Sequence, residues 1–409
     1  MSDVTDETTQ TDIDGQEARQ ARRRLFLLSS TFFFIFAGAG AQQLYTVPYL
    51  KDCTEWTGLM RGLVVATVYI SMMVFRLGNV YLLRNWSNRR LTFVGSLTYT
   101  TFTLVLLATF WLKSYPLAII GAAVWGWGGA AMWAGTAMQV LEASDKGKRH
   151  GLNTGLLYAG THGGWMTGVV VLGLVYEHHA WPPYTLYIVA VAITAIGNVL
   201  AGMQPASSEA FAEKPTLREL MRVSSRAKVR IAGFLMAASA MAFGLMLSVF
   251  GDHVKLQYGV QYIWITAMLY PAGRMVLSIV GGALADRVGH GFLMSAGFVS
   301  AAVGMTIAAQ WDSIVAMGVA ALSLALLNGT VPVASTAMVG DSAERKRRPL
   351  AYGALFAYRD LGVVVSAIWG KVLMHEGGQF AQTFSTFTIV FIACGLVALL
   401  LQRYARERL

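Results

Sequence analysis

Five ionisable side chains lie inside long apolar stretches of the sequence. They are Arg76, His162, Arg274, Arg359 and Asp360. A charge in the middle of a membrane-length segment costs roughly 2.5 to 3.5 kcal/mol on insertion scales, so such residues usually face a cavity or a partner. Guanidinium groups bind carboxylates and oxyanions through two parallel hydrogen bonds. The three arginines therefore predict a binding site for a small anion.

Asp360 and His162 are the candidates for carrying a coupling proton. Asp360 is the only acid that we place deep in an apolar segment, where desolvation favours its neutral form. An imidazole such as that of His162 titrates near neutrality. Two structural alternatives stay open at this point. Asp360 neutralises an arginine so that the charges only hold helices together, or His162 serves packing and hydrogen bonding.

The composition is that of a membrane protein. Of 409 residues, 55% are hydrophobic and 13% are charged, against about 25% charged in a typical soluble domain. This excludes a soluble enzyme, a disordered protein and a disulfide scaffold. The basic residues behind the net charge of +10 are scattered between apolar runs, so we expect no nucleic-acid partner. Without a Walker loop, metal-ligand cluster or nucleophile triad, we expect no enzymatic activity, metal or cofactor.

Twelve apolar runs approach the length of about 20 residues that spans a bilayer. The predicted fold class is an all-α membrane protein with twelve transmembrane helices. The runs cover residues 25–46, 62–83, 91–112, 115–141, 152–176, 183–204, 231–251, 261–285, 291–310, 313–338, 350–374 and 381–402.

The basic residues predict the orientation, because Lys and Arg accumulate in cytoplasmic loops. Most of them lie in the loops on the side of the two termini. We therefore expect an integral protein of the plasma (inner) membrane with both termini in the cytoplasm. The predicted domains are a disordered tail (1–20), a six-helix half (21–204), a cytoplasmic linker with an amphipathic helix (205–230) and a second six-helix half (231–409).

An internal repeat supports the division into halves. Ala134-Gly-Thr136-Ala137-Met138 matches Ala334-Ser-Thr336-Ala337-Met338 at an offset of 200 residues. Arg76 and Arg274 lie 198 residues apart, as do His162 and Asp360. Parallel repeats of this kind are typical of secondary transporters. The offset predicts that spans 2, 5, 8 and 11 are related in pairs.

The segment Gly282-Ala-Leu-Ala-Asp286-Arg287-Val-Gly289 resembles the G-x-x-x-D-R-x-G loop of the major facilitator superfamily. The resemblance implies two pseudo-symmetric six-helix halves and transport by alternating access. It also implies a latch in which the loop Asp meets a helix N-terminus and the Arg meets a carboxylate. The gating residues that it implies are Gly282, Asp286, Arg287 and Gly289, with Arg89 and Arg90 in the corresponding loop of the first half.

Two features resemble, in part, the nitrate and nitrite porters of that superfamily. One is an arginine near the middle of the membrane in each half, where the porters clamp the anion between such a pair. The other is the segment Gly151-Leu152-Asn153-Thr154-Gly155 at the start of span 5. Nitrate is therefore one candidate among small anions.

We predict a monomeric secondary transporter in the lipid bilayer that moves a small anionic solute, nitrate-like or an organic carboxylate, with a proton as the candidate coupling ion in a symport. One alternative is a neutral or amphipathic solute in an aromatic cavity formed by Trp125, Trp127, Trp133 and Trp165. Another is a transport-inactive relative that acts as a scaffold or regulator. The predicted substrate-binding residues are Arg76, Arg274, Arg359, Gln42, Gln43, Tyr45, Trp133, Tyr270 and Asn328.

Overall fold

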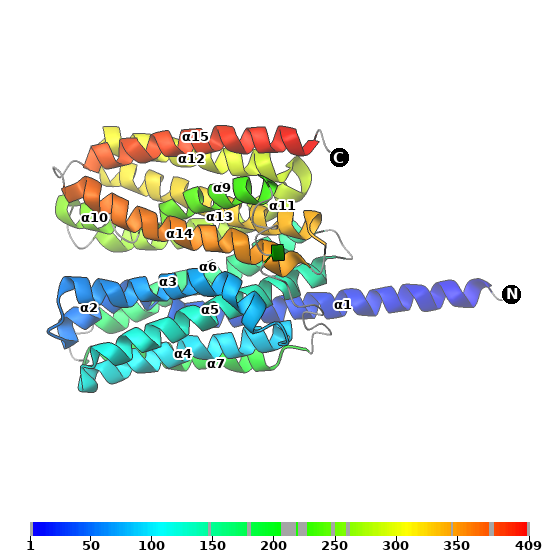
Figure 1. Cartoon of the computed structure of the whole chain (residues 1–409), viewed down its shortest axis with the longest axis horizontal. Helices are drawn as coiled ribbons and strands as arrows, with labels where there is room; N and C mark the ends of the chain where they lie inside the picture. The colour runs from blue at the N-terminus through cyan, green and yellow to red at the C-terminus, as the bar shows by residue number, and fades with distance from the viewer. Residues whose placement is uncertain are drawn as a thin grey trace.

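The described chain is a bundle of long helices joined by short connections (Figure 1). The structure is a computed structural model. It describes residues 3–145, 149–177, 181–205, 218–219, 227–246, 250–258, 262–344, 347–375 and 380–406. Most of the predicted linker, 205–230, lies outside these residues.

The first half contains seven α-helices and one π-helix. They are α1 (Asp3–Ile35), the π-helix η1 (Phe36–Gly40), α2 (Gln43–Cys53), α3 (Gly58–Leu82), α4 (Asn88–Leu112), α5 (Tyr115–Ser144), α6 (His150–Glu177) and α7 (Thr185–Gly202).

The second half follows the linker. Its helices are α9 (Ala227–Leu245), α10 (Gly251–Tyr258), α11 (Ile263–Val288), α12 (His290–Gln310), α13 (Ile314–Ser342), α14 (Arg348–His375) and α15 (Phe380–Arg406). Because η1 and α2 continue α1, and α10 follows α9, these helices account for the twelve predicted spans. The predicted fold class is confirmed.

The two halves lie side by side with their helices roughly parallel (Figure 1). Across the interface, α3 contacts α14 and α6 contacts α11. These four helices are the predicted spans 2, 5, 8 and 11. Both ends of the chain lie toward the same end of the bundle (Figure 1). We call this end the terminal face; its interface residues are Asp145, His150, Asp286, His290, Asp341 and Arg348.

Nine helices of the described chain are long and apolar enough to cross a membrane by length and composition. The interface helices α6 and α14 are not among them. α6 carries His162, and α14 carries Arg359 and Asp360. Ionisable side chains in a membrane helix face a protein interface and not lipid, and they lower the mean hydropathy of the helix. The hydropathy criterion therefore omits two of the four helices that line the interface between the halves.

The first predicted span, 25–46, is not one straight α-helix. The chain forms a π-helix at Phe36–Gly40 and α2 then continues to Cys53. At the break the Ala39 amide donates to the Thr194 hydroxyl of α7 at 2.9 Å. A Cβ at Gly38 would lie 2.1 Å from the same hydroxyl. The irregular turn therefore depends on a glycine and on a hydroxyl supplied by a neighbouring helix.

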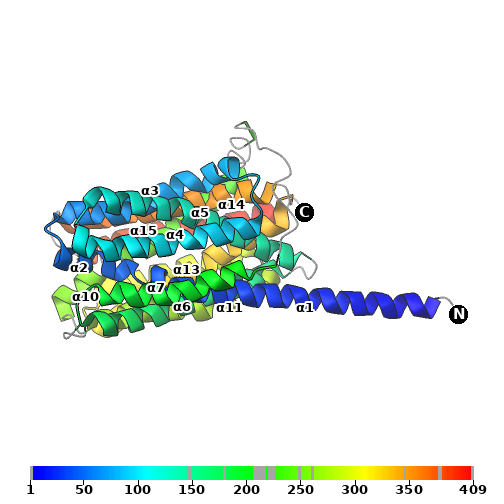
Figure 2. The same cartoon turned by 90° about the horizontal axis from the view of Figure 1, so that it is seen from below.

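The N-terminal tail also differs from its prediction. The structure begins α1 at Asp3, whereas the sequence predicts disorder over 1–20. This part of α1 extends beyond the bundle (Figure 2). The segment Gln16-Glu-Ala-Arg-Gln-Ala-Arg-Arg that leads into the span consists of strong helix formers, which favours backward continuation of the helix of the first span.

Glycines allow α6 to pack closely against the first helix. A Cβ at Gly160, Gly164 or Gly168 would lie 2.8, 2.1 or 2.0 Å from the backbone oxygen of Ser29, Phe33 or Ala37. Their four-residue spacing places them on one face of α6. Small residues at such positions let helix backbones approach each other in a membrane.

Gly164→Ala is expected to lower the thermal stability of the detergent-purified protein. Adding a Cβ at 2.1 Å from the Phe33 oxygen forces α6 away from α1, and overpacking of this kind costs about 1 to 3 kcal/mol. The matched control is Gly62→Ala in α3, where a Cβ would meet nothing within 4 Å. The control should be neutral or slightly stabilising, because alanine favours helix over glycine. Equal effects of the two variants would contradict the packing assignment.

Candidate functional site

Two arginines share one buried carboxylate at the interface between the halves. Arg76 Nε of α3 donates to Asp360 Oδ2 of α14 at 2.9 Å, and Arg359 Nη1 donates to Asp360 Oδ1 at 2.9 Å. Arg76 Nη2 also contacts Met72 Sδ at 3.2 Å. Asp360 is fully buried and Arg76 is 2% exposed. This ion pair connects the first half to the second, and it engages both oxygens of Asp360.

Arg274 of α11 has a different environment. It is buried, and among the described residues no carboxylate pairs with it. Its guanidinium carbon lies 5.2 Å from the ring centre of Tyr270, 5.8 Å from that of Phe243 and 5.9 Å from that of Trp165. Cation–π contacts at these distances stabilise the charge without neutralising it. Arg274 is therefore the arginine of this region whose charge has no acidic partner.

His162 of α6 lies in the same region. It is 3% exposed, and within the described chain neither ring nitrogen has a hydrogen-bond partner. Its ring centre is 5.9 Å from that of Tyr158, and both Arg274 and Arg359 act on it electrostatically. Buried polar groups are normally hydrogen-bonded, so an imidazole without a partner indicates a place for a polar ligand.

Three further predicted residues lie at or next to this region. The Tyr270 hydroxyl has no partner among the described residues, although its ring is against Arg274. Gln43 Oε1 accepts a hydrogen bond from the hydroxyl of Tyr69 at 2.5 Å, and Tyr69 interacts electrostatically with Arg359 and Asp360. The neighbouring Gln42 is fully buried, and neither amide atom has a partner in the described structure.

The other three predicted lining residues have structural contacts. Asn328 Nδ2 donates to the Ser239 carbonyl at 2.9 Å, and the Tyr45 hydroxyl donates to the Val169 carbonyl at 2.5 Å. Trp133 packs edge-on against Phe32, with ring centres 4.9 Å apart. Asn328 and Tyr45 therefore form hydrogen bonds between helices, a role that polar residues in membrane helices often have.

The sequence prediction missed Tyr69 and Phe243. Tyr69, Met72 and Arg76 are spaced three and four residues apart, so they lie on one face of α3, and that spacing was available as a signal. Phe243 is an apolar residue in an apolar helix and carries no such signal. Its contact with Arg274 depends on how α9 is placed in the bundle, where it packs mainly against α14 and α13.

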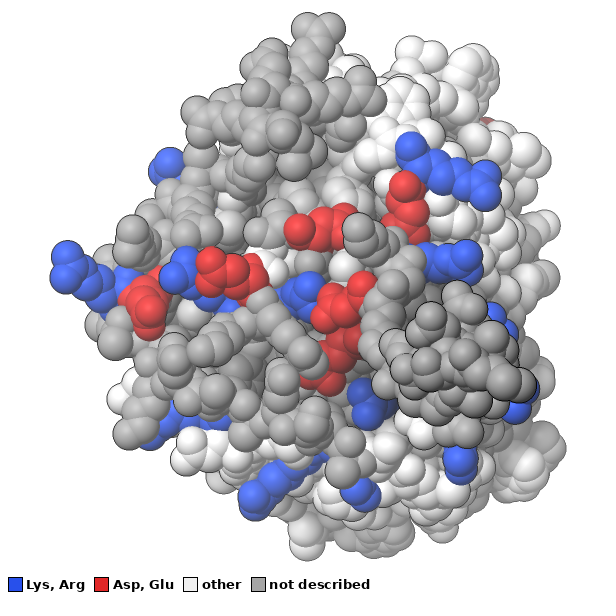
Figure 3. Space-filling view, turned by 90° about the vertical axis from the view of Figure 1, so that its right-hand side faces the viewer, with Lys and Arg blue, Asp and Glu red and all other residues white. Residues whose placement is uncertain are grey.

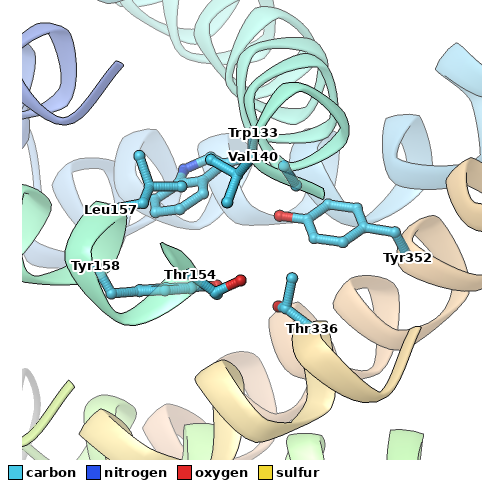
Figure 4. A pocket seen from close by; sticks show the side chains of 8 residues that line it. Trp133, Val140, Thr154, Leu157, Tyr158, Thr336 and Tyr352 are labelled. Atoms are coloured by element: carbon cyan, nitrogen blue, oxygen red, sulfur yellow. The ribbon is translucent and has the colours of Figure 1, made fainter. Parts of the chain in front are cut away.

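Aromatic residues fill the interface between this region and the terminal face. Figure 4 shows Tyr158 and Thr154 of α6 facing Thr336 of α13 and Tyr352 of α14, with Trp133 of α5 beside them. Tyr158 lies about one helical turn before His162, and Tyr352 lies about two turns before Asp360. Side chains from both halves therefore meet here, on the terminal side of the charged residues.

Asp286 binds the N-terminus of α6 at the terminal face. Its Oδ1 accepts from the Gly151 amide at 2.9 Å and its Oδ2 accepts from the Leu152 amide at 3.0 Å. The partial positive charge of a helix N-terminus favours a carboxylate in this position. The contact joins the second half to the first and has the geometry that the loop resemblance implies. Its role in gating stays a prediction.

Glycines make this contact possible. A Cβ at Gly282 would lie 2.4 Å from the Gly151 carbonyl oxygen, so α11 and α6 touch backbone to backbone. Gly289 has φ of 94°, a conformation that side chains disfavour, and it connects α11 to α12. The expectation for Arg287 differs from the structure. This residue is exposed, and the described residues supply no carboxylate to it.

The corresponding loop of the first half does not reach across the interface in its described contacts. Arg89 Nη2 donates to the Gly202 carbonyl at 2.7 Å, and the Arg90 guanidinium lies 4.3 Å from the Trp86 ring centre. Asn88 Nδ2 donates to Glu142 Oε1 at 2.7 Å. All of these partners belong to the first half. The two loops are therefore not equivalent, and residues 83–90 of the first loop contain no Asp or Glu that could take the part of Asp286.

A second connection at the terminal face contains two histidines. His150 lies between Asp341 of the second half, at 2.7 Å, and Asp145 of the first, at 3.0 Å. His290 Nε2 contacts the other oxygen of Asp341 at 2.8 Å, and Arg348 Nη2 binds Asp145 at 2.8 Å. Figure 3 shows acidic side chains gathered near the middle of this face with basic ones around them. We call these five residues the terminal network.

The terminal network shifts the ionisation of its members, which precede or follow the membrane-spanning segments. Hydrogen bonding to Asp341 raises the pKa of His150 above its ordinary 6.5, and the bond to Asp145 adds to this against the effect of burial. Burial raises the pKa of Asp145 and of Asp341, but hydrogen bonds outweigh this effect. Asp145 accepts from Arg348 and His150, and Asp341 accepts from His150 and His290, so the pKa of each carboxyl is lowered below its ordinary 3.8. The charged forms of all three are favoured together.

The stabilising effect of His150 is expected to depend on pH. A raised pKa in the folded state means that this effect is complete below about pH 6.5 and is lost as the pH rises through the raised value. The unfolding temperature of the wild type should therefore exceed that of His150→Gln most at pH 5 to 6 and least at pH 9.

The control for this measurement is His253→Gln, at the opposite end of the bundle. Burial lowers the pKa of His253, so its effect on stability should fall with falling pH instead. A difference between the wild type and His150→Gln that is the same at every pH would contradict the ionised network.

Comparison with known proteins assigns the family. The sequence matches the model of the Major Facilitator Superfamily over residues 27–262 and 229–408. No curated protein matches the chain. Among solved structures, an MFS transporter, FucP, in the outward conformation has a TM-score of 0.74 at 14% identity, covering 93% of this chain and 99% of that one. A variant of the E. coli fucose:proton symporter FucP has a TM-score of 0.71 at 14% identity, covering 92% and 98%. These structures share the fold, and the match to the family covers most of the sequence, so the chain belongs to the major facilitator superfamily of secondary transporters.

Proposed function

We propose that this transporter carries a small anion, and the charge balance of its interface is the observation that supports the proposal. Arg76, Arg274 and Arg359 bring three guanidinium groups to the region around His162. Asp360 is the only carboxylate among the buried residues that the structure describes. An uncompensated charge in a medium of low polarity is costly, so a site with excess positive charge favours an anionic ligand. Arg274 is the binding residue in this proposal.

The described conformation supports a transport cycle with a closed terminal face. Asp286 on the α6 N-terminus, the terminal network and the aromatic layer around Tyr158 and Tyr352 all join the halves on that side of Arg274. We propose that the terminal face is cytoplasmic, because the basic loops lie on this side. Release of the anion into the cytoplasm then requires these contacts to break while the halves rock around the site.

We propose Asp360 as the proton carrier, with His162 as the second candidate. A proton on Asp360 would remove the charge that holds Arg76 and Arg359, and both would then be available to other anions. Proton uptake and anion affinity would be linked through the same carboxylate. The name of the fucose:proton symporter, which shares this fold, is compatible with proton coupling here.

Transport of a neutral solute is the alternative, and the positions of the tryptophans argue against a large aromatic cavity. Trp125 stacks on Phe102 at 4.8 Å and Trp133 packs against Phe32, so both contribute to the core of the first half. Trp165 is the tryptophan that lies against Arg274. Its aromatic surface is therefore adjacent to a cation.

Arg274→Ala should abolish anion binding while the protein remains folded. We would measure thermal unfolding of the detergent-purified protein with nitrate, acetate, succinate, phosphate and a neutral sugar. A ligand at 100 times its Kd stabilises by about 2.7 kcal/mol, which is readily detected. The wild type should be stabilised by at least one of the anions, and the Arg274→Ala variant by none.

The matched control is Arg84→Ala, at the end of α3, where the guanidinium lies 5.3 Å from the Tyr81 ring centre and away from the site. This variant should keep the response of the wild type. Stabilisation by the sugar alone, or full anion binding by Arg274→Ala, would overturn the proposed function.

Asp360→Asn should uncouple uptake from a proton gradient. The amide keeps the shape of the carboxylate but cannot take up a proton at neutral pH. In proteoliposomes, an inward proton gradient should stimulate anion uptake by the wild type and leave uptake by the variant unchanged. Removing one partner of a buried ion pair costs about 3 to 5 kcal/mol, so binding is measured first to show that the variant is folded. The surface change Glu344→Gln should retain stimulation; stimulation of Asp360→Asn would exclude this residue as the carrier.

A further inference from the structure

The three arginines are not equivalent as ligands for a solute. Arg76 Nε and Arg359 Nη1 are both held by Asp360, one on each oxygen. Arg274 has no such carboxylate in the described chain; Arg274 Nε and Arg76 Nη1 are both buried without a hydrogen bond, but only the Arg76 guanidinium is paired with an acid. With Asp360 ionised, one guanidinium group is available. One guanidinium fork matches the two oxygens of one carboxylate.

The surroundings of Arg274 are aromatic and come from both halves. Phe243 of α9 and Tyr270 of α11 belong to the second half, whereas Trp165 of α6 belongs to the first. The Trp165 and Phe243 rings meet at 72° with centres 5.6 Å apart. A solute bound to Arg274 and lying against these rings would contact both halves, as a site that is exposed alternately to the two sides requires.

Hydrogen-bonding atoms around Arg274 are left without partners. Within the described residues these include Trp165 Nε1, the Tyr270 hydroxyl and both ring nitrogens of His162, all on side chains at least nine-tenths buried. Leaving such groups unpaired is unfavourable, and a bound carboxylate accepts hydrogen bonds from several donors at once, here the Trp165 and Tyr270 groups and the one N–H of a neutral His162 ring. The ligand that satisfies this region therefore has one compact anionic group.

From this arrangement we infer that the solute is an organic monocarboxylate whose carboxylate binds Arg274 and whose planar, apolar body packs against Phe243 and Trp165. The inference rests on the proposed function and narrows it. A dicarboxylate needs a second free cation, and with Asp360 ionised, as in the described structure, Arg76 and Arg359 are both engaged by it. Nitrate presents polar oxygens on all sides and gains nothing from the Phe243 ring, whereas an aromatic body forms favourable ring contacts.

The test compares four probes by isothermal titration of the full-length purified protein. They are benzoate, nitrate, succinate and benzamide, the neutral isostere of benzoate. Benzoate should bind about two- to tenfold more tightly than nitrate or succinate, because only benzoate uses both the guanidinium and the rings, and ring contacts contribute about that factor. Benzamide should show no binding in the same concentration range.

Two substitutions separate the carboxylate from the apolar body. Phe243→Leu keeps an apolar side chain but removes the ring, and it should weaken benzoate about fivefold while leaving nitrate unchanged. The matched control is Phe391→Leu in α15, a fully buried phenylalanine that packs on Phe298; it should change neither. Arg274→Lys keeps the charge but removes the fork and should weaken benzoate about tenfold.

The outcomes test this inference separately from the proposed anion transport on which it rests. If nitrate or succinate binds as tightly as benzoate, the inference of a monocarboxylate solute is overturned, but the proposed transport of a small anion is not. Benzamide binding as tightly as benzoate, with no loss in Arg274→Lys, would overturn both. Failure of all four probes to bind, or an equal loss of benzoate affinity in Phe243→Leu and Phe391→Leu, would also overturn the inference.

Discussion

The carboxylate of Asp360 controls the charge of the whole interface. It lies in the second half, it binds Arg76 from the first half and Arg359 from its own helix, and it is completely removed from water. Burying these three charges is tolerable only because they are hydrogen-bonded to one another. The same contact brings α3 against α14. It also determines the environment of Arg274. Because Asp360 pairs with Arg76 and Arg359, Arg274 contacts aromatic rings and has no carboxylate partner among the described residues. The proposed anion site is a consequence of that division.

Close backbone contact is the second constraint, and it acts mainly on the terminal face. Gly151 and Gly282 allow α6 and α11 to touch, and only at that separation can Asp286 reach the amides at the start of α6. The terminal network adds charged side chains from both halves around His150. These contacts are short, polar and located outside the apolar spans, so they can form and break without exposing apolar core to water. That property suits the opening of this face in the proposed transport cycle.

The corresponding loops of the two halves make different contacts. In the second half, Asp286 crosses to the other half. In the first half, Arg89, Arg90 and Asn88 contact only residues of their own half. The repeated helices kept their places, as the pairing of α3 with α14 and α6 with α11 shows. The connections differ because only the second one contains a carboxylate, Asp286, that a helix N-terminus attracts.

The sequence by itself determined the membrane class, the twelve spans, the loop that contains Asp286 and the helices on which the buried charges lie. These follow from local properties: apolar length, the rule for basic loops, and the spacing of glycine and charge. Only the tertiary structure decided which charges meet. Arg76 and Arg274 hold related positions in the repeat, yet one is paired with Asp360 and the other is not. Phe243 gave no sign of its place beside Arg274, and Tyr45 and Asn328 form hydrogen bonds between helices. The break at Gly38 likewise needed Thr194, a residue far along the chain. Pairing between distant segments depends on how helices rotate and pack against one another, and the hydropathy of a single segment does not contain that information.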